Sequence, residues 1–224
     1  MARFELLGTA VIPGKGTQLR LLQRNDEFSI RIAGSSGELM NSRLHGSEDA
    51  LATLACEHIS DNPAPRVLIG GLGMGFTLAA ALSALGDTAE VTVAELVPEV
   101  EQWNLGPLGS AAGYPLKDPR ARVYIGDVVQ LIKDSRASFD AILLDIDNGP
   151  EGLTRKENDW LYTMPGIAAA QAALTSDGIL AYWSAGQDPA FTERLKLAGL
   201  SVEPVTVRAH RPGKGAKHVI WLAW

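Results

Sequence analysis

The sequence contains a single cysteine, Cys56, so the chain cannot form a disulfide within itself. Without disulfides, nothing in the sequence indicates an oxidising compartment. The first ten residues also lack the unbroken apolar stretch of a secretory signal, because Arg3 and Glu5 interrupt it. We therefore expect a cytoplasmic protein.

An excess of positive charge is also missing. The chain has 20 lysines and arginines against 26 aspartates and glutamates, which gives a net charge of −6. This balance removes the uniform basic field with which nucleic-acid-binding proteins neutralise phosphates, so we do not expect a nucleic-acid partner. Six basic residues gather near the C-terminus and are interpreted as a solvated face: Arg208, His210, Arg211, Lys214, Lys217 and His218.

Neither a membrane span nor a metal site is indicated. One charge-free stretch, residues 67–86, is long enough to cross a bilayer, but it carries four closely spaced glycines. Glycines between a β-branched start and an Ala/Leu-rich end predict a strand, a tight loop and a helix instead. Cys56 and His58 stand two residues apart on a predicted helix, where they point in different directions, and no second ligand pair accompanies them.

The chain does contain enough apolar residues for a large core, since 46% of its 224 residues are hydrophobic. This length accommodates one large domain, or one domain with a small appendage. Residues 1–46 have a β-like pattern around the turn residues Asn25 and Asp26, which predicts a small antiparallel cap. Residues 47–224 are then the main domain, with Ser47 as the N-cap of a helix that includes residues 50–59.

From Arg66 onward strands and helices alternate, which predicts a parallel sheet covered by helices on both faces. Pro165 is expected to kink or split the helix that contains it. Residues 209–216 separate the last two strands and include a proline and two glycines, so the final strand should run antiparallel. The predicted strands are residues 66–70, 90–95, 122–125, 139–145, 178–184, 201–208 and 217–224, and the predicted helices are residues 76–85, 98–103, 127–133, 158–174 and 189–197.

The number and direction of these strands indicate the fold class. Seven strands with an antiparallel last member resemble the Rossmann-like α/β sheet of the class I S-adenosylmethionine-dependent methyltransferases. An NAD-binding Rossmann domain normally has six strands, all parallel. We therefore predict a class I methyltransferase sheet with a small N-terminal β cap.

The loop after the first main strand reads Gly70-Gly-Leu-Gly-Met-Gly75. Glycines let the backbone approach a ligand closely, and the following helix N-terminus presents unpaired N–H groups to the polar end of that ligand. The dinucleotide fingerprint would need a further glycine at the position of Phe76. We expect Gly70, Gly71, Gly73 and Gly75 to bind an adenosyl cofactor.

Acids follow the next two strands. Glu95 ends its strand twenty residues after the glycine loop, where a carboxylate can accept both hydroxyls of a ribose. Asp127 follows the third strand, where it can accept a hydrogen bond from an adenine amino group, cap the next helix, or do both. With their neighbours Leu96 and Val128, these acids predict one ligand crevice at the carboxyl edge of the sheet.

Several segments together resemble the spermidine synthase (polyamine aminopropyltransferase) family. The likeness covers nearly the whole chain. It implies S-adenosylmethionine or its decarboxylated form as the cofactor and a small amine as the substrate, and it leaves a homodimer open. The segments are Val67-Leu-Ile-Gly-Gly-Leu-Gly-Met-Gly75, Ala94-Glu-Leu96, Ile125-Gly-Asp127, Phe139-Asp-Ala-Ile-Leu-Leu-Asp145 and Pro212-Gly-Lys-Gly215.

The chain departs from that family at three places. The family's glycine loop carries an acid that holds the aminopropyl ammonium of decarboxylated S-adenosylmethionine, and here that position is Gly73. The family's Asp-Ser-Ser/Thr-Asp-Pro motif begins at Asp145, but Asn148 replaces its second acid. A tyrosine usual before the first helix is missing, with Ser47-Glu-Asp49 in its place.

The missing loop acid decides between two reactions. Such an acid would repel the carboxylate of intact S-adenosylmethionine, so its absence makes methyl transfer to a small amine or cationic acceptor our leading expectation. Aminopropyl transfer to a polyamine is the alternative, since another acid can replace the missing one from elsewhere in the fold. A second alternative is a non-catalytic adenosyl-nucleotide binder.

Both transfers are in-line displacements at a carbon attached to a sulfonium, which is already an activated leaving group. Positioning is then most of the task, together with one base that keeps the amine unprotonated. Asp145 is expected to be this base and to contact the cofactor. Asp147, Asn148, Trp160 and Tyr162 are expected to bind the substrate. Four residues lie between the cap and the main domain, and this position alone leads us to expect that they close over the pocket: Arg43, His45, Ser47 and Glu48.

Overall fold

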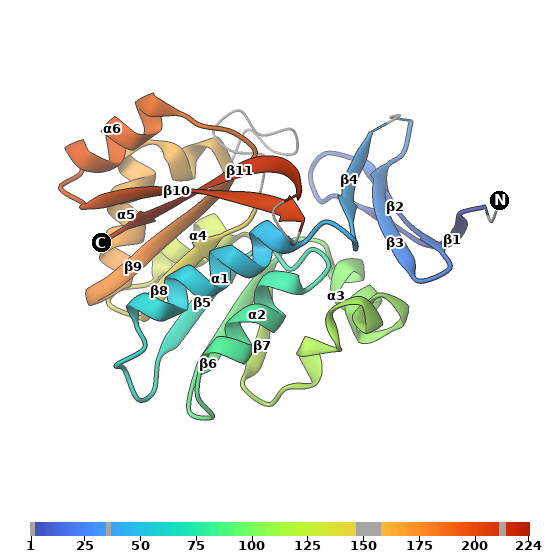
Figure 1. Cartoon of the computed structure of the whole chain (residues 1–224), viewed down its shortest axis with the longest axis horizontal. Helices are drawn as coiled ribbons and strands as arrows, with labels where there is room; N and C mark the ends of the chain where they lie inside the picture. The colour runs from blue at the N-terminus through green and yellow to red at the C-terminus, as the bar shows by residue number, and fades with distance from the viewer. Residues whose placement is uncertain (1–2, 35–36, 147–157, 211–213) are drawn as a thin grey trace.

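The computed structural model describes residues 3–34, 37–146, 158–210 and 214–224. Figure 1 shows a small sheet next to a larger sheet that is covered by helices. The small sheet is antiparallel in the order β1-β2-β3-β4 and confirms the predicted cap. Its second hairpin turns at Asn25, whose φ of 55° lies in the left-handed region that asparagine tolerates. The strands are β1 (Glu5–Val11), β2 (Gln18–Arg24), β3 (Glu27–Ile32) and β4 (Glu38–Asn41).

The large sheet has seven strands in the order β10-β11-β9-β8-β5-β6-β7. The last strand of the chain, β11, lies between β9 and β10 and is antiparallel to both, whereas the pairings of β5 through β9 are parallel. This arrangement confirms the predicted class I methyltransferase sheet. The strands are β5 (Arg66–Gly70), β6 (Glu90–Glu95), β7 (Ala121–Ile125), β8 (Phe139–Leu144), β9 (Leu174–Ser184), β10 (Val202–His210) and β11 (Lys214–Ala223).

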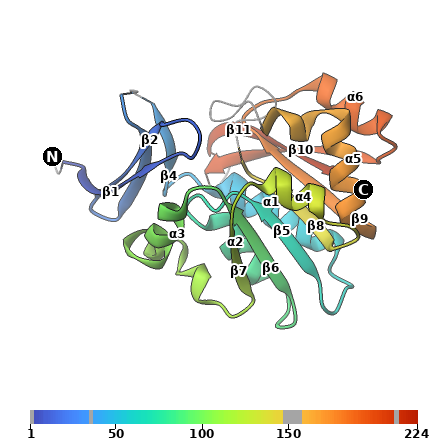
Figure 2. The same ribbon diagram turned by 180° about the vertical axis from the view of Figure 1, so that it is seen from behind.

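Helices cover both faces of the large sheet, as Figures 1 and 2 show from opposite sides. Val67 and Ile69 of β5 belong to the core that includes α1 and α2, while Leu68 belongs to the core that includes α4 and α5. Because β5 is buried on both faces, it reads as an unbroken apolar run. The helices are α1 (Gly46–His58), α2 (Phe76–Ala84), α3 (Pro98–Leu105), α4 (Val128–Asp134), α5 (Met164–Ala173) and α6 (Pro189–Leu197).

The small sheet packs on α3 through one close contact. Trp103 of α3 is buried, and a Cβ added to Gly8 of β1 would lie 2.6 Å from its Nε1. A glycine is therefore needed where β1 crosses the indole. Two short 3₁₀ helices, η1 (Pro107–Ala112) and η2 (Pro115–Lys117), follow α3 and were not among the predicted elements.

The start of α1 and the break before α5 lie at other residues than predicted. Ser47 is not the N-cap of α1, because the helix begins at Gly46 with His45 as its N-cap, and Ser47 is fully buried within the first turn. The predicted helix 158–174 is interrupted at Thr163, two residues before Pro165, which lies in the first turn of α5. The 3₁₀ helix η3 (Asn158–Tyr162) precedes Thr163, whose hydroxyl caps α5 by accepting a hydrogen bond from the Gly166 N–H.

No helix in the described part of the chain is both long enough and apolar enough to span a bilayer. Cys56 is buried within α1, where burial raises the pKa of its thiol to about 12. A thiol with that pKa is protonated at neutral pH and packs as a small apolar side chain.

Candidate active site

The glycine loop between β5 and α2 has a backbone that only glycine adopts easily. Gly71, Gly73 and Gly75 have φ angles of 92°, 52° and 84°, all in the left-handed region. A Cβ on Gly71 would also lie 2.5 Å from the carbonyl oxygen of Asp145. The Asp145 N–H in turn donates to the Gly70 carbonyl at 3.0 Å, so the loop and the end of β8 lie against each other.

Two side chains from neighbouring elements fix this loop. Glu95 at the end of β6 is buried and accepts hydrogen bonds from the N–H groups of Leu72 (3.1 Å) and Val97 (2.8 Å). Its burial raises the pKa of the carboxyl group, and these backbone donors oppose the rise. Asn104 of α3 donates from Nδ2 to the Gly73 carbonyl at 2.9 Å. Asn104 could not be predicted from the sequence, because its contact with the loop depends on how α3 packs.

A cavity of about 130 Å³ lies along the ends of β6 and β7. Glu95, Leu96, Asp127 and Val128 line it, and Asp127 also caps α4 by accepting from the Val129 N–H at 2.9 Å. The small sheet closes the other side with apolar residues that include Ile12, Leu19 and Ile30. The predicted crevice therefore exists at the expected edge, and the adenosyl-binding roles of these residues stay a prediction.

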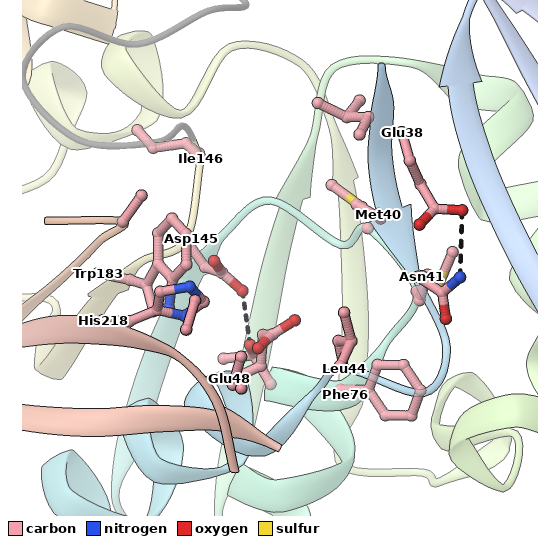
Figure 3. A pocket seen from close by; sticks show the side chains of 18 of the residues that line it. Glu38, Met40, Asn41, Leu44, Glu48, Phe76, Asp145, Ile146, Trp183 and His218 are labelled. Atoms are coloured by element: carbon pink, nitrogen blue, oxygen red, sulfur yellow. Dashed lines mark hydrogen bonds between the residues drawn. The ribbon is translucent and has the colours of Figure 1, made fainter. Parts of the chain in front are cut away.

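A larger cavity of about 350 Å³ adjoins the first, between β4, the N-terminus of α1, the glycine loop and the ends of β8, β9 and β11. Its acidic residues are Glu38, Glu48 and Asp145, and the described residues that line it include no lysine or arginine. Figure 3 shows Asp145 and Glu48 next to each other, with Glu38 on the opposite side. Five residues line both cavities: Leu39, Met40, Gly73, Asp145 and Ile146.

The two neighbouring acids of the larger cavity have raised pKa values. Burial raises the pKa of Asp145 to about 6, and the Thr77 hydroxyl opposes this by donating to its carboxylate at 2.8 Å. Burial, followed by the charge of Asp145, raises the pKa of Glu48 to about 7, while a hydrogen bond from the Ser47 hydroxyl at 2.6 Å lowers it. Groups that titrate near neutral pH in a cavity are suited to bind or release protons there.

Some predicted residues lie away from both cavities. Gly70 packs against Leu144, and Gly75 packs against Asn104 and η2. Tyr162 is 2% exposed and packs edge-on to Phe191 in the core, while Trp160 lies under the ammonium of Lys133. Both aromatic residues lie in η3 and pack in or against the core, and neither lines either cavity.

Other expectations fall elsewhere. Asp147 and Asn148 lie outside the described residues. Glu48 does line the larger cavity, as its position between cap and main domain suggested. The sequence analysis missed Glu38 and Trp183 in the same wall. It also interpreted His218 as part of a solvated basic face, yet His218 is half-buried in the cavity wall, with Nδ1 2.9 Å from the Ser47 hydroxyl.

Comparisons with known proteins point to one family. The chain is similar to a spermidine synthase solved with the transition-state analogue AdoDATO, with 17% identity, a TM-score of 0.70 and coverage of 99% of this chain and 73% of that one. It is also similar to the spermidine synthase from Thermotoga maritima, with 17% identity, a TM-score of 0.72 and coverage of 97% of this chain and 71% of that one. A probable spermidine synthase from Corynebacterium glutamicum shows 15% identity, a TM-score of 0.62 and coverage of 99% of this chain and 80% of that one. At these identities the likeness establishes the fold.

The sequence itself carries the family assignment. None of the curated proteins compared with the chain matches it. A model of the spermine/spermidine synthase domain, however, matches residues 61–196, which is more than half of the chain and includes the glycine loop and Asp145. The chain therefore belongs to the spermine/spermidine synthase family.

Proposed function

We propose that this protein transfers the aminopropyl group of decarboxylated S-adenosylmethionine to an amine of the polyamine class. The observation that carries the proposal is the charge of the larger cavity. Three carboxylates line it, and none of its described residues is a lysine or arginine. Such a cavity favours cationic groups, and the aminopropyl donor and a polyamine acceptor are both cations without a carboxylate.

The same charge argues against methyl transfer, which the sequence analysis favoured. Intact S-adenosylmethionine carries a carboxylate, and two like charges about 4 Å apart repel each other by about 4 kcal/mol at the effective dielectric of a protein surface. Gly73 does leave the loop uncharged, but Glu38, Glu48 and Asp145 bring acids from β4, α1 and β8 to the same space. Membership of the family supports the aminopropyl alternative as well.

The proposed reaction follows the arrangement of the two cavities. The adenosine occupies the smaller cavity near Glu95 and Asp127, and the sulfonium lies where the two cavities meet, beside Asp145. The acceptor nitrogen attacks the carbon of the aminopropyl chain that is bonded to the sulfonium, so a C–N bond forms and the C–S bond breaks. The products are 5′-methylthioadenosine and the extended amine, and the proton of the attacking nitrogen passes to Asp145.

Donor selectivity tests this proposal. We expect decarboxylated S-adenosylmethionine to bind at least about 100-fold more tightly than the intact form, because only the intact form brings a carboxylate to the acidic cavity. Calorimetric titration of the purified protein with each donor measures this ratio. A diamine added to the protein with the decarboxylated donor should then yield methylthioadenosine. Equal affinities, or methylation of the amine by the intact donor, would contradict the proposal.

The substitution Thr77→Val tests how Asp145 is kept ionised. The Thr77 hydroxyl lowers the pKa of Asp145, so its removal should raise that pKa by about one unit from its value of about 6. Because only the carboxylate accepts the proton, kcat/KM at pH 6 should fall about fivefold and change little at pH 9. A pH–rate profile measures both limits. Thr77→Ser keeps the hydroxyl and should keep the parental profile; an unshifted profile in Thr77→Val would refute the assignment.

A further inference from the structure

We infer that Glu48 is the specificity-determining residue of this site and that it binds the terminal ammonium of the aminopropyl donor. The inference rests on the proposed function and adds to it the residue that distinguishes the decarboxylated donor from the intact one. Glu48 comes from the first turn of α1, outside the glycine loop. Of the three acids that line the larger cavity, Glu48 alone has neither a balancing cation among the described residues nor a part in the proposed proton transfer.

Glu38 already has partners within the protein. Its Oε1 accepts hydrogen bonds from the Ser29 hydroxyl at 2.5 Å and from Asn41 Nδ2 at 3.1 Å. The Arg31 guanidinium lies 3.5 Å from the same oxygen. The charge of Glu38 is thus balanced by a cation of the small sheet, and Figure 3 places this acid on the opposite side of the cavity from Asp145.

Asp145 is occupied in a different way. It lines both cavities, so it lies at the point where the sulfonium and the attacking nitrogen meet. Its Oδ2 accepts from the Thr77 hydroxyl. A group that must take up the proton of the attacking amine cannot also serve as the permanent counter-charge of a second ammonium without losing basicity.

Glu48 remains without a balancing charge. It accepts hydrogen bonds from the Ser47 hydroxyl and from its own backbone N–H, and no lysine or arginine among the described residues forms an ion pair with it. It lines only the larger cavity and lies beside Asp145 (Figure 3). An aminopropyl chain that starts from a sulfur at the junction therefore extends toward Glu48.

The glycine loop cannot supply this charge instead. A Cβ on Gly73 would lie 3.1 Å from the sulfur of Met40, and the φ of 52° there disfavours most side chains. Met40 thus fills the space into which a loop side chain would project, and Figure 3 shows it above the loop. With that position closed, a carboxylate from α1 is the remaining unbalanced acid.

The electrostatics of Glu48 agree with a role in binding a cation. The titratable groups that face it are Asp145, which directly follows β8, and Asp49 on α1, both of which raise its pKa, and His218 on β11, whose Nδ1 lies against Ser47. Burial and these acids hold the pKa of Glu48 at about 7. An ammonium favours the ionised carboxylate, so donor affinity should rise as the pH increases through 7.

Three ligands and four variants test the inference. Decarboxylated S-adenosylmethionine, the intact form and 5′-methylthioadenosine share the adenosine, but only the first carries an ammonium without a carboxylate. In Glu48→Gln, we expect the affinity for the decarboxylated donor to fall about 30-fold or more and its advantage over the intact form to be lost. Affinity for methylthioadenosine should stay within about twofold. Glu57→Gln, an exposed residue of the same helix, should leave all three affinities unchanged.

The outcomes separate this inference from the proposed function. If the wild-type protein does not prefer the decarboxylated donor, the proposed function fails and the inference fails with it. If the wild type prefers it and Glu48→Gln keeps the preference, or Glu38→Gln abolishes it instead, the inference alone is wrong. Glu48→Asp retains the charge and should keep part of the preference. If Glu48→Gln also loses affinity for methylthioadenosine, the variant Glu48→Asp decides. A folded Glu48→Asp protein that loses the preference for the decarboxylated donor as completely as Glu48→Gln would overturn the inference.

Discussion

Asp145→Asn is expected to slow aminopropyl transfer by about 10²- to 10⁴-fold while the affinity for methylthioadenosine stays within a few fold. Asparagine has the shape of aspartate and its side-chain oxygen can still accept from the Thr77 hydroxyl, so the cavity keeps its form. It cannot take up the proton of the attacking amine. The substitution also removes the negative charge that raises the pKa of Glu48, so that pKa should fall.

Single-turnover measurements at saturating donor and amine isolate this chemical step, because they do not depend on product release. The loss should be smaller at high pH, where more of the free amine is already deprotonated. Asp49→Asn offers a comparison, since it removes an acid near Glu48 that does not line either cavity. A single-turnover rate in Asp145→Asn within threefold of the parent would exclude Asp145 as the proton acceptor.

Gly71→Ala is expected to weaken methylthioadenosine binding by about 100-fold or more and to lower the stability of the fold. Two physical effects add here. The φ of 92° strains any residue with a Cβ, at a cost of about 1–3 kcal/mol, and the added carbon would lie 2.5 Å from the Asp145 carbonyl oxygen. Since that neighbour is backbone, the loop and the end of β8 must move apart, and the two cavities change shape together.

Thermal unfolding and calorimetry measure the two parts of this effect. Gly86→Ala is the matched control, because a Cβ there meets nothing within 4 Å and its φ is not in the left-handed region. The control should keep its affinity and its melting temperature within about 2 °C. A Gly71→Ala protein that melts and binds like the control would show that the loop does not need its present backbone.

Much of the large sheet could be predicted from the sequence because its signals are local. Apolar runs such as that of β5, the proline at residue 165 and the turn residues before β11 each specify structure within a few positions. The boundary of α1 could not be predicted in this way, because Gly46 packs against the backbone of β10, where an added Cβ would lie 3.0 Å from the Arg208 carbonyl oxygen. The division of the chain at residues 46 and 47 stays a prediction.

In the candidate site, too, residues specified by a local pattern could be predicted, whereas residues placed by packing could not. The acids at the ends of β6, β7 and β8 were identified because parallel strands bring their carboxyl ends to one edge. Glu38 and Trp183 come from β4 and β9, and only the packing of the small sheet brings the former to the cavity. Trp160 and Tyr162 lie in or against the apolar core, as aromatic residues near a helix start often do, and their predicted substrate role stays a prediction.

Leu39 and Met40 of β4 line both cavities, although β4 is not part of the large sheet. Under the proposed function, these two residues of a short edge strand lie against both the adenosine and the amine, so substitutions there should alter the recognition of both. All four residues of this strand, Glu38–Asn41, line the larger cavity, so variation confined to them should change the space that the proposed function assigns to the amine.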